Sequence, residues 1–589
     1  MMFRQAEKHG KRPFLWAKRD GKYQSQSWLE VRDAIVTMAL ALKRLGVQAG
    51  DRVAIVSENR PEWLIADHAI MAIGAISVPV YTTYAPRDYR HVLENSGASA
   101  VIISTARLAR LVLTAAHHVD SCRHAITIEE PQVKQHLNLS IENWDALMNE
   151  DVATDEQRKE MIEGAGSASR NDVACLIYTS GTGGAPRGVM QHHGSILHNC
   201  AGAAEVMKSY GLGDDRFLSF LPLSHAYEHS AGQFFPIFLS AEIYYAEGLD
   251  KLATNMGEAR PTVMVVVPRL FEVLRTRIQR TIAKESLTKQ KLFKRSMALG
   301  TKAFKSPGSL GFFERLQFGF LDRTVRKKAR GRFGGKLKAM VSGGAPLNPE
   351  VGEFFAGLGL DIVQGYGQTE SGPVISVNRP ELIKMDTVGP PLANTTVKIA
   401  DDGEILVRGE LVMHGYWRDE DSTKAVLRDG WLHTGDIGLI DADGHLKITD
   451  RKRDIIVNDK GENISPQRIE GMLALENEIA QAMVYGDKKP YIVGLIVPDS
   501  EWIAEWAPAQ NLSTDPSVLK TEKAFLKALD EAVGRINRKL GNLEKVRRFL
   551  VADAPFDIEN GQMTPTLKIR RHIIAKAYKD RLESLYKSN

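Results

Sequence analysis

The sequence predicts an α/β protein of several lobes, in which helices flank mixed or parallel sheets. The chain has 589 residues, which is too long for one hydrophobic core and requires at least two domains. Between residues 51 and 104, short apolar runs alternate with helical patterns, and this alternation is typical of a parallel sheet covered by helices. We expect this first lobe to be a scaffold without chemistry of its own.

The elements of this lobe can be read in order. The predicted strands occupy 53–56, 77–80 and 100–103, and the predicted helices occupy 63–73 and 89–95. Residues 140–171 are polar, so we expect a loop-rich segment there.

A glycine-rich loop then connects a predicted strand at 173–178 to a predicted helix at 195–208. Glycines let backbone N–H groups converge on one point and nearby hydroxyls add donors, so the loop suits a polyphosphate anion. The loop ends with the positively charged Arg187, which is followed by Gly188. The P-loop of NTPases has Ser or Thr after its lysine, so this loop does not fit that pattern. The candidate phosphate ligands are Thr179, Ser180, Gly181, Thr182, Gly183, Gly184 and Arg187.

Two further segments follow predicted strands at 217–223 and 337–341. His225 comes just after the first strand, at the sheet edge where α/β folds bind ligands, and a purely structural histidine is the alternative. Small residues follow the second strand and would let a flat ring approach the backbone closely. These small residues are Gly343, Gly344, Ala345 and Pro346.

The segment after a predicted strand at 361–364 combines three chemical functions. Tyr366 can stack on adenine, Thr369 can donate to a phosphate oxygen, and Glu370 can hold a hard cation. Further on, the carboxylate of Asp436 offers two acceptor oxygens, which suit the two hydroxyls of a ribose. The other nucleotide-site candidates near Tyr366 are Gln364, Gly365 and Gly367.

Composition sets limits on the partners. The net charge of +5, 43% hydrophobic residues and 25% charged residues are ordinary for a globular protein. No zinc-finger spacing or RNA-binding signature occurs, so nucleic acid is not an expected partner. Three separated cysteines favour a reducing compartment, and neither a membrane-spanning run nor a signal-like N-terminus is found. We therefore expect a cytoplasmic protein.

Residues 284–338 stand apart because they contain 16 Lys or Arg residues against three acidic ones, with phenylalanines interleaved. Among these are Phe293, Phe304, Phe312, Phe313, Phe318 and Phe320. Such a segment can contact an anionic membrane surface at the inner face of a membrane. The alternative is a solvated charged face over phenylalanines that belong to the core. Both interpretations stay open.

The order of these segments resembles that of the adenylate-forming (AMP-binding) superfamily. Residues 178–188 are similar to its Tyr-Thr-Ser-Gly-Thr-Thr-Gly-x-Pro-Lys-Gly loop, with Gly183 in place of Thr and Arg187 in place of Lys. Residues 365–370 match Gly-Tyr-Gly-x-Thr-Glu, and residues 430–436 match Gly-Trp-x-x-Thr-Gly-Asp. The long segment 284–338, and the Thr-Leu pair before Lys568, resemble the long-chain fatty acyl-CoA synthetases.

The resemblance implies a large N-terminal domain, 1–451, and a small mobile α+β C-terminal domain, 452–589, with Arg453 as the pivot. It implies that ATP activates a long-chain fatty acid to an acyl-adenylate, with release of pyrophosphate, and that CoA then takes the acyl group. Mg²⁺ would be the cofactor, with ATP and CoA as co-substrates.

The resemblance also implies roles for single residues. Lys568, Thr369, Glu370 and His225 would be catalytic, and Arg451 would join Asp436 at the ribose. Glu370 and Thr179 would hold Mg²⁺. Lys460, Gly461 and Glu462 would belong to a segment that faces the nucleotide in the CoA step.

Two other functions remain open. A fatty acyl-AMP ligase would pass the acyl group to a carrier protein instead of CoA. A non-catalytic lipid- or nucleotide-binding relative would have lost activity through Gly183 and Arg187. The sequence does not decide between a monomer and a homodimer, nor does it give the preferred chain length.

Overall fold

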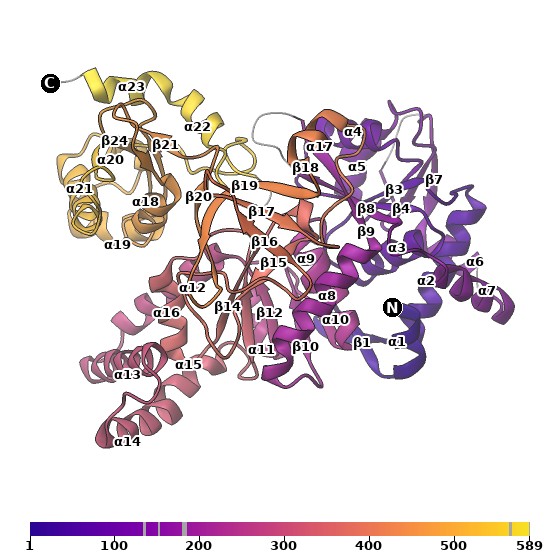
Figure 1. Ribbon diagram of the computed structural model, residues 1–589, viewed down its shortest axis with the longest axis horizontal. Coiled ribbons are helices and arrows are strands. Elements are labelled where there is room, and N and C mark those ends of the chain that lie inside the picture. The colour runs from indigo at the N-terminus through magenta and orange to yellow at the C-terminus, as the bar shows by residue number, and fades with distance from the viewer. Residues whose placement is uncertain (133–136, 151–152, 180–184, 565–567, 588–589) are drawn as a thin grey trace.

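The computed structural model describes residues 1–132, 137–150, 153–179, 185–564 and 568–587. Three sheets form the large part of the molecule, and two smaller sheets belong to a separate body after residue 454. Figure 1 shows this body, which contains β24 and α21, at one end of the molecule, above the helices α12 and α16. The expected α/β architecture is confirmed.

The first sheet has the order β7-β6-β5-β3-β4-β8-β9. All its neighbouring strands are parallel except β8 and β9. The strands and helices predicted between residues 51 and 104 are confirmed within a few residues at their ends. The strands are β3 (Arg52–Val56), β4 (Ile76–Val80), β5 (Ala100–Ile103), β6 (His124–Thr127), β7 (Ser140–Asn143), β8 (Val173–Thr179) and β9 (Arg187–His192). The helices that accompany this sheet are α2 (Trp28–Arg44), α3 (Pro61–Ala72), α4 (Pro86–Ser96) and α5 (Ala106–Ala116).

The prediction of a loop-rich segment at 140–171 is wrong. The chain there forms β7, then α6 (Trp144–Glu150) and α7 (Asp155–Gly166). Helix α7 starts at a capping box, in which Thr154 and Gln157 each satisfy the other's backbone N–H. Trp144 and Met161 are buried, so a few apolar anchors were enough to hold polar helices on the surface.

The second sheet has the order β15-β14-β13-β12-β10-β11-β1-β2 and is parallel except at its two outermost strands. Its strands are β1 (Pro13–Arg19), β2 (Lys22–Ser27), β10 (Arg216–Ser219), β11 (Glu242–Tyr245), β12 (Val263–Val266), β13 (Ala339–Ser342), β14 (Ile362–Gly367) and β15 (Val374–Val377). The helices beside it are α1 (Met2–His9), α8 (His193–Met207), α9 (Ala226–Glu228), the π-helix η2 (His229–Phe234), α10 (Phe235–Leu239), α11 (Leu252–Ala259), α12 (Pro268–Ala283) and α16 (Pro349–Leu358).

The strand expected at 217–223 is shorter than predicted, because β10 ends at Ser219. The backbone there is hydrogen-bonded to Asn59 of the first lobe instead of to a neighbouring strand. Nδ2 of Asn59 donates to the Leu221 carbonyl at 2.7 Å, and its Oδ1 accepts from the Leu223 N–H at 3.1 Å. Pro222 has no N–H to offer a neighbouring strand. The chain therefore leaves the sheet before it reaches His225.

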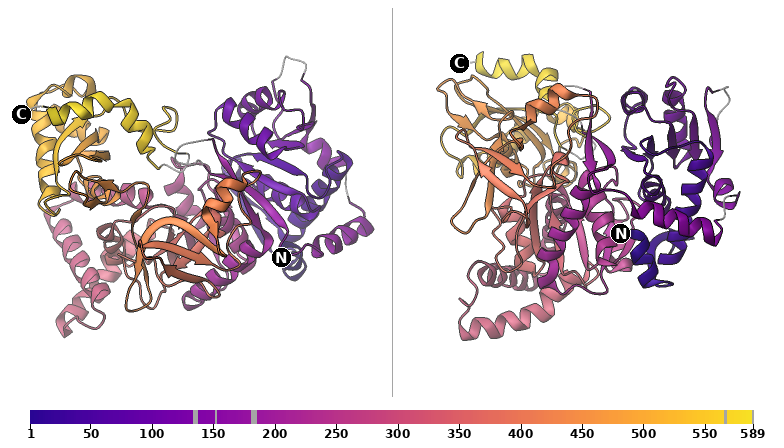
Figure 2. Two further views of the ribbon diagram at one scale, coloured as in Figure 1. Left: turned by 45° about the horizontal axis from the view of Figure 1, so that its top comes forward. Right: turned by 45° about the vertical axis from the view of Figure 1, so that its right-hand side comes forward.

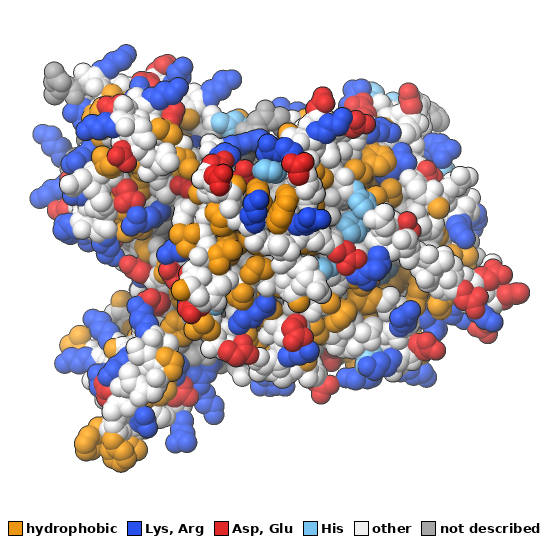
Figure 3. Space-filling view, in the orientation of Figure 1, with side chains coloured by type: hydrophobic (Ala, Val, Ile, Leu, Met, Phe, Trp, Pro, Cys, Tyr) orange, Lys and Arg blue, Asp and Glu red, His pale blue; other side chains and the backbone are white. Residues whose placement is uncertain are grey.

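A helical lobe projects from the second sheet. It contains α13 (Leu287–Lys305), α14 (Phe312–Leu321), the π-helix η3 (Asp322–Arg326) and α15 (Lys327–Gly331). Figure 1 shows α13 and α14 extending away from the rest of the molecule, and Figure 3 shows hydrophobic side chains gathered at the tip of this projection. The lobe is anchored by close packing of α13 on α16.

A third sheet joins β16 (Thr396–Ile399), β17 (Glu404–Arg408), β18 (Leu427–Arg428), β19 (Trp431–Ile440) and β20 (Leu446–Arg451), with α17 (Glu420–Val426) before β18. Strand β20 leads directly into the C-terminal body.

The C-terminal body has its own core, in which Ile503, Phe525 and Leu529 are among the buried side chains. Figure 2 shows it beside the second and third sheets in two further views. Its elements are β21 (Ile456–Val457), β22 (Asn463–Ile464), α18 (Pro466–Leu473), β23 (Ile479–Tyr485), β24 (Ile492–Pro498), α19 (Ser500–Ala509), α20 (Pro516–Leu519), α21 (Lys523–Asn537), β25 (Val546–Val551), α22 (Arg571–Ala577) and α23 (Lys579–Lys587). Across the described ranges, no helix combines the length and apolarity needed to span a bilayer.

Gly300→Ala should destabilise the protein by about 1–3 kcal/mol, the usual cost of overpacking. A Cβ at Gly300 would overlap the Gly357 carbonyl oxygen of α16, so α13 would have to move. Gly319→Ala in α14 is the matched control, because a Cβ there meets nothing within 4 Å. Urea unfolding should show the loss for the first variant only, and equal stability of the two variants would contradict the close packing.

Candidate active site

The carboxylate of Asp436 is the point at which three strands meet. Its Oδ2 accepts a hydrogen bond of 2.7 Å from the Tyr366 hydroxyl at the end of β14, and its Oδ1 accepts one of 3.0 Å from Nε of Arg451 in β20. Asp436 is only 4% exposed, and a buried carboxylate requires such partners. The three residues predicted for the nucleoside are therefore brought together.

Glu370 lies in a second cluster, which joins the first sheet to the segment after β17. The Tyr416 hydroxyl donates to its Oε1 at 2.8 Å, and the Tyr416 ring lies under the Arg187 guanidinium, 4.6 Å from the ring centroid. The backbone carbonyl of Thr369 accepts from Nε2 of Gln191 at 2.9 Å. Arg187, Thr369 and Glu370 thus share one side of the site, at the end of β14 and the start of β9.

Lys568 comes from the C-terminal body and reaches this N-terminal site. Burial and the nearby Arg451 charge lower the pKa of its ammonium to about 8, while Asp436 and Glu370 act in the opposite direction. Its backbone N–H donates to Oγ1 of Thr564 at 3.1 Å, and the Thr564 N–H donates to its carbonyl at 2.8 Å. In Figure 1 the segment that precedes α22 extends toward β19.

His225 is a neutral imidazole in this structure. Burial, assisted by the charge of Lys568, lowers the pKa of its ring to about 3. The backbone N–H of Tyr227 donates to its Nδ1 at 3.2 Å, so Nδ1 must be the unprotonated nitrogen. Nε2 therefore carries the proton, and it can donate a hydrogen bond to an anionic oxygen.

Tight packing explains two of the predicted glycines. A Cβ on Gly343 would lie 2.8 Å from the Tyr227 ring, which is fixed because its hydroxyl donates to the Val341 carbonyl at 2.9 Å. A Cβ on Gly367 would overlap the Pro373 carbonyl oxygen. Close backbone approach therefore requires glycine at both positions.

The remaining predicted residues lie in different settings. Gly344 has φ +82°, Gly365 lies opposite Val377 of β15, and Ala345 and Pro346 are exposed beside them. Gln364 is buried, and its Nε2 donates to the Met385 carbonyl at 2.7 Å, so its amide group supports the strand. Thr179 ends β8. The predicted loop residues Ser180, Gly181, Thr182, Gly183 and Gly184 lie outside the described residues.

The turn at Lys460, Gly461 and Glu462 lies in the C-terminal body and is exposed. Oδ1 of Asn458 accepts from the N–H groups of Lys460 and Glu462 at 2.9 Å, and Gly461 has φ +82°. Lys568 of the same body has charged neighbours in the site, namely Arg451, Asp436 and Glu370. Arg453 is exposed, two residues after Arg451.

The profile of the AMP-binding enzyme family matches residues 2–417. The chain belongs to this family. The profile of the AMP-binding enzyme C-terminal domain matches residues 453–589.

Relatives of the AMP-binding enzyme family extend over the whole chain. The long-chain-fatty-acid–CoA ligase FadD15 of Mycobacterium tuberculosis is 33% identical over 569 residues, which cover 96% of this chain and 93% of that protein. Long chain acyl-CoA synthetase 3 of Arabidopsis thaliana is 29% identical, with 97% and 88% covered.

Solved structures of AMP-binding enzymes share the fold. The anthranilate CoA ligase AuaEII in complex with anthranoyl-AMP has a TM-score of 0.74 at 20% identity, with 99% of this chain and 97% of that chain covered. The A domain of the carboxylic acid reductase from Segniliparus rugosus, in complex with AMP and a co-purified carboxylic acid, has a TM-score of 0.75 at 20% identity, with 100% and 93% covered.

Two residues of this site were missed by sequence reasoning. Tyr416 links Arg187 to Glu370, and its place in the His-Gly-Tyr-Trp run at 414–417 was the available signal. Glu228 lies three residues after His225, and its Oε1 accepts from Oγ of Ser219 at 2.7 Å. Its Oε2 is buried without a hydrogen-bond partner among the described residues. Nothing in the sequence distinguishes this carboxyl from an exposed one.

Glu228→Gln should remove a pH-dependent loss of stability. Burial raises the pKa of the Glu228 carboxyl to about 8 from an ordinary 4.5, so the folded protein keeps a proton that the unfolded chain releases. Stability of the wild type should therefore fall as pH rises from about 4.5 to about 8, by at most about 1.4 kcal/mol per pH unit from this group.

Urea unfolding should be measured across this pH range. The free energy of unfolding of Glu228→Gln, relative to that of the wild type, should increase as pH rises. Glu156→Gln, at an exposed position of α7, is the control and should follow the wild type. A stability difference between Glu228→Gln and wild type that does not change with pH would mean that the Glu228 carboxyl is already ionised.

Proposed function

We propose that this protein is an AMP-forming long-chain fatty acid–CoA ligase. In the first step a fatty carboxylate oxygen bonds to the α-phosphorus of ATP, and the bond to the leaving pyrophosphate breaks. In the second, the sulfur of CoA bonds to the acyl carbonyl carbon and AMP leaves. The position of Lys568 among Glu370, Asp436 and Arg451 supports this proposal most directly, together with the curated relatives that align over the whole chain.

Lys568 is proposed to catalyse the first step. An attacking carboxylate and an α-phosphate both carry negative charge, so a positioned cation must stabilise their approach. A pKa of about 8 keeps most of this ammonium charged at neutral pH. Bound anionic phosphates would favour the charged form further.

The Asp436 cluster is proposed to bind the nucleoside. Each carboxylate oxygen can accept more than one hydrogen bond, so Asp436 can hold Tyr366 and Arg451 and still accept from ribose hydroxyls. The Tyr366 ring, fixed by its hydroxyl, would stack on adenine next to Gly343, Gly344, Ala345 and Pro346. Gln364, Gly365 and Gly367 would shape this wall.

We assign the ATP phosphates to the cluster that contains Arg187, Thr369 and Glu370. Arg187 would face the leaving pyrophosphate and Thr369 would donate to a phosphate oxygen, with Ser180 to Gly184 completing the loop. A ligand set of one carboxylate plus substrate phosphates is the usual one for Mg²⁺. Glu370 fits this role because Tyr416 donates to its Oε1 and no described residue donates to its Oε2, and Thr179 would add a hydroxyl. The ion would supply positive charge to the phosphates.

His225 is proposed to orient the fatty carboxylate. A neutral ring with its proton on Nε2 can donate to a carboxylate or acyl-phosphate oxygen without adding a competing positive charge. The Tyr227 N–H at Nδ1 fixes the orientation of the ring.

The second step is proposed to use another position of the C-terminal domain, 452–589. Rotation near Arg453 would withdraw Lys568 and bring the turn at Lys460, Gly461 and Glu462 toward the acyl-adenylate. The charge requirement changes after pyrophosphate leaves, which is a physical reason for using two positions of one domain.

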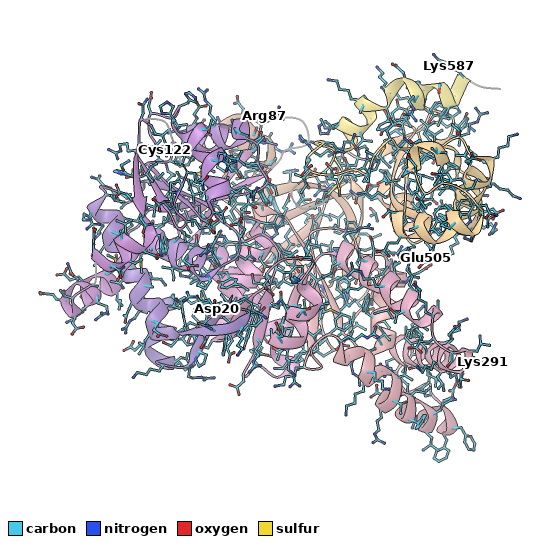
Figure 4. The ribbon with its side chains drawn as sticks, turned by 180° about the vertical axis from the view of Figure 1, so that it is seen from behind. Asp20, Arg87, Cys122, Lys291, Glu505 and Lys587 are labelled. Carbon is cyan, nitrogen blue, oxygen red and sulfur yellow. The ribbon has the colours of Figure 1, made fainter. Side chains whose placement is uncertain are left out.

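Ion pairs across the domain boundary support a movable contact. Arg280 of α12 pairs with Asp499 at 2.9 Å and with Glu501, and Lys284 pairs with Glu505 at 3.1 Å. Figure 4 marks Glu505 at the edge of the C-terminal body. A cavity of about 530 Å³ also lies at the boundary, lined by Arg269 of the N-terminal domain and by residues 556–559 and 563 of the C-terminal body, with Gln481. Partly exposed ion pairs and an open cavity hold two bodies less firmly than a packed apolar interface does.

Lys568→Ala should separate the two half-reactions. We expect adenylation to fall by about 10²–10³-fold, because one fixed charge at the transition state is lost, while thioester formation from supplied palmitoyl-adenylate should be retained. Pyrophosphate release, AMP and palmitoyl-CoA would be measured with palmitate, ATP and Mg²⁺, with and without CoA.

The same assay tests the alternatives. A fatty acyl-AMP ligase would release pyrophosphate but consume no free CoA. A non-catalytic relative would release no pyrophosphate from any fatty acid. Equal loss of both half-reactions in Lys568→Ala would contradict the assigned role of Lys568.

Arg280→Ala should lower the adenylation rate by about two- to fivefold, because partly exposed ion pairs are each worth little. The thioester-forming step should be unchanged or faster, because the competing domain position becomes more populated. Arg277→Ala on the same helix is the control, since Arg277 is exposed and has no ion pair with any described residue. Identical half-reaction rates for the two variants would show that the ion pairs do not govern the domain position.

The lipid substrate also suggests where the enzyme works. We propose that segment 284–338 makes peripheral contact with a membrane, from which long-chain fatty acids could be taken.

A further inference from the structure

The phenylalanines of segment 284–338 fall into two groups. Phe293 is buried at 8% exposure and Phe318 is partly covered by the guanidinium of Arg326, 4.7 Å from its ring centroid. In contrast, Phe312 is 72% exposed and Phe313 is 82% exposed. The interpretation of these residues as core therefore fails for the second group.

The exposed group occupies one face of α14. With 3.6 residues per turn, residues 312, 313, 316 and 320 lie along one side of the helix, and Leu316 and Phe320 are 61% and 62% exposed. The opposite side holds Phe318 and the buried Leu321 against the lobe. The tip patch, defined as Phe312, Phe313, Leu316 and Phe320, is thus an unpartnered apolar face, and Figure 3 shows it at the end of the projection.

The helix that carries this patch contacts α13 through polar side chains on its other side. Nζ of Lys302 in α13 pairs with the Glu314 carboxylate at 2.7 Å, and Nε of Arg295 donates to Oε1 of Gln317 at 2.9 Å. These two contacts use the side of α14 away from the patch, so the exposure of the patch belongs to the folded lobe. Farther along the chain, Arg326 at the end of η3 donates to the Gly357 carbonyl of α16 at 2.9 Å.

The lobe that carries the patch is strongly positive. All three acidic residues of the segment are already bound, because Glu285 pairs with Lys289, Glu314 with Lys302, and Asp322 with Arg326 and Arg330. Among the residues that the structure describes, Lys291, Lys294, Arg323, Lys327 and Lys328 are exposed and have no ion pair. Figure 4 marks Lys291 on the projecting lobe.

We propose that the tip patch inserts into the interfacial region of an anionic lipid bilayer while the surrounding cations bind the lipid phosphates. This deepens the peripheral contact included in the proposed function by assigning it to one face of α14. Aromatic and leucine side chains beside Lys and Arg are the composition of helices that lie in a membrane interface. An exposed cluster of large apolar groups is otherwise unfavourable in water.

The same charges disfavour two other occupants. In a symmetric pair of chains, equal patches would meet and bring unpaired cations of like sign together. Nucleic acid would satisfy the cations, but four adjacent apolar side chains at the tip would gain little from a phosphate backbone. An anionic bilayer satisfies both parts of the surface.

The test is vesicle binding by the full-length chain without ATP, CoA or fatty acid. Vesicles of equal parts phosphatidylcholine and phosphatidylglycerol would be compared with phosphatidylcholine alone by flotation. We expect strong binding to the first and weak binding to the second, and a decrease with added salt. Because no substrate is present, the result is independent of whether the ligase assignment is right.

Two variants address the two parts of the surface. Phe312→Ser with Phe313→Ser should reduce binding to anionic vesicles by about tenfold or more, and Lys291→Gln with Lys294→Gln should reduce it by a similar or smaller factor. The controls are Leu249→Ser, which removes a 60% exposed side chain outside the lobe, and Lys22→Gln with Lys43→Gln, which removes two exposed charges elsewhere. Thermal unfolding would verify that all variants fold.

Three results would overturn the proposal. These are unchanged vesicle binding by the double serine variant, equal binding to neutral vesicles, and a wild-type dimer in sedimentation that the serine variant alone dissociates. Binding of single-stranded RNA that competes fully with anionic vesicles, and that the serine variant retains, would assign the cations to nucleic acid instead.

Discussion

The carboxylate of Asp436 is the interaction on which the arrangement of the site depends. It joins the end of a strand in the large parallel sheet to two strands of the third sheet, through Tyr366 and Arg451. A charge buried this deeply is stable only while its partners stay in place. Arg451 ends β20 directly before the C-terminal body, so the same contact fixes the point from which that body extends. One buried anion thus organises both the Tyr366 side of the site and the start of the C-terminal body.

Burial controls the protonation of three further groups. His225 is held neutral, the pKa of Lys568 is lowered, and that of Glu228 is raised, in each case chiefly because the charged form loses its hydration. The acidic residues Asp436 and Glu370 counteract this effect at Lys568. Lys568 brings its ammonium to this site from the C-terminal body. Under the proposed rotation, its charge would be present in the arrangement described here and withdrawn in the other.

Much of the fold could be predicted from local patterns. The parallel strands β3, β4 and β5 are short, apolar and separated by helical patterns, and nothing else in the sequence competes with this interpretation. The helix α7 was missed because its apolar anchors are sparse and its stability depends on a capping box and on packing that a polar sequence does not reveal. The end of β10 was misplaced because it is set by Asn59, more than a hundred residues earlier in the chain.

The site was predictable where a motif is continuous and unpredictable where it depends on distant contacts. Residues 365–370 and 430–436 could be recognised as segments, whereas the hydrogen bond between Tyr366 and Asp436 could not. Tyr416 and Glu228 were not predicted because the chemical role of a tyrosine or a glutamate depends on its burial and on its neighbouring side chains, which the sequence does not show. Gln364 shows the converse, since it lies in a recognisable motif and yet its amide group supports the backbone at Met385.

The contact between Gly300 and Gly357 has a consequence for how the molecule meets a surface. A Cβ on Gly300 would overlap the Gly357 carbonyl oxygen, so the backbones of α13 and α16 are in close contact. This contact restricts movement of the projecting lobe relative to the second sheet, in which β14 carries Tyr366. A flexible tether would let the enzyme tumble over a bilayer in many orientations. If the tip patch inserts as proposed, this attachment would favour one angle between the tip of the lobe and Lys568, so a fatty acid leaving the lipid layer would approach the site from the same side.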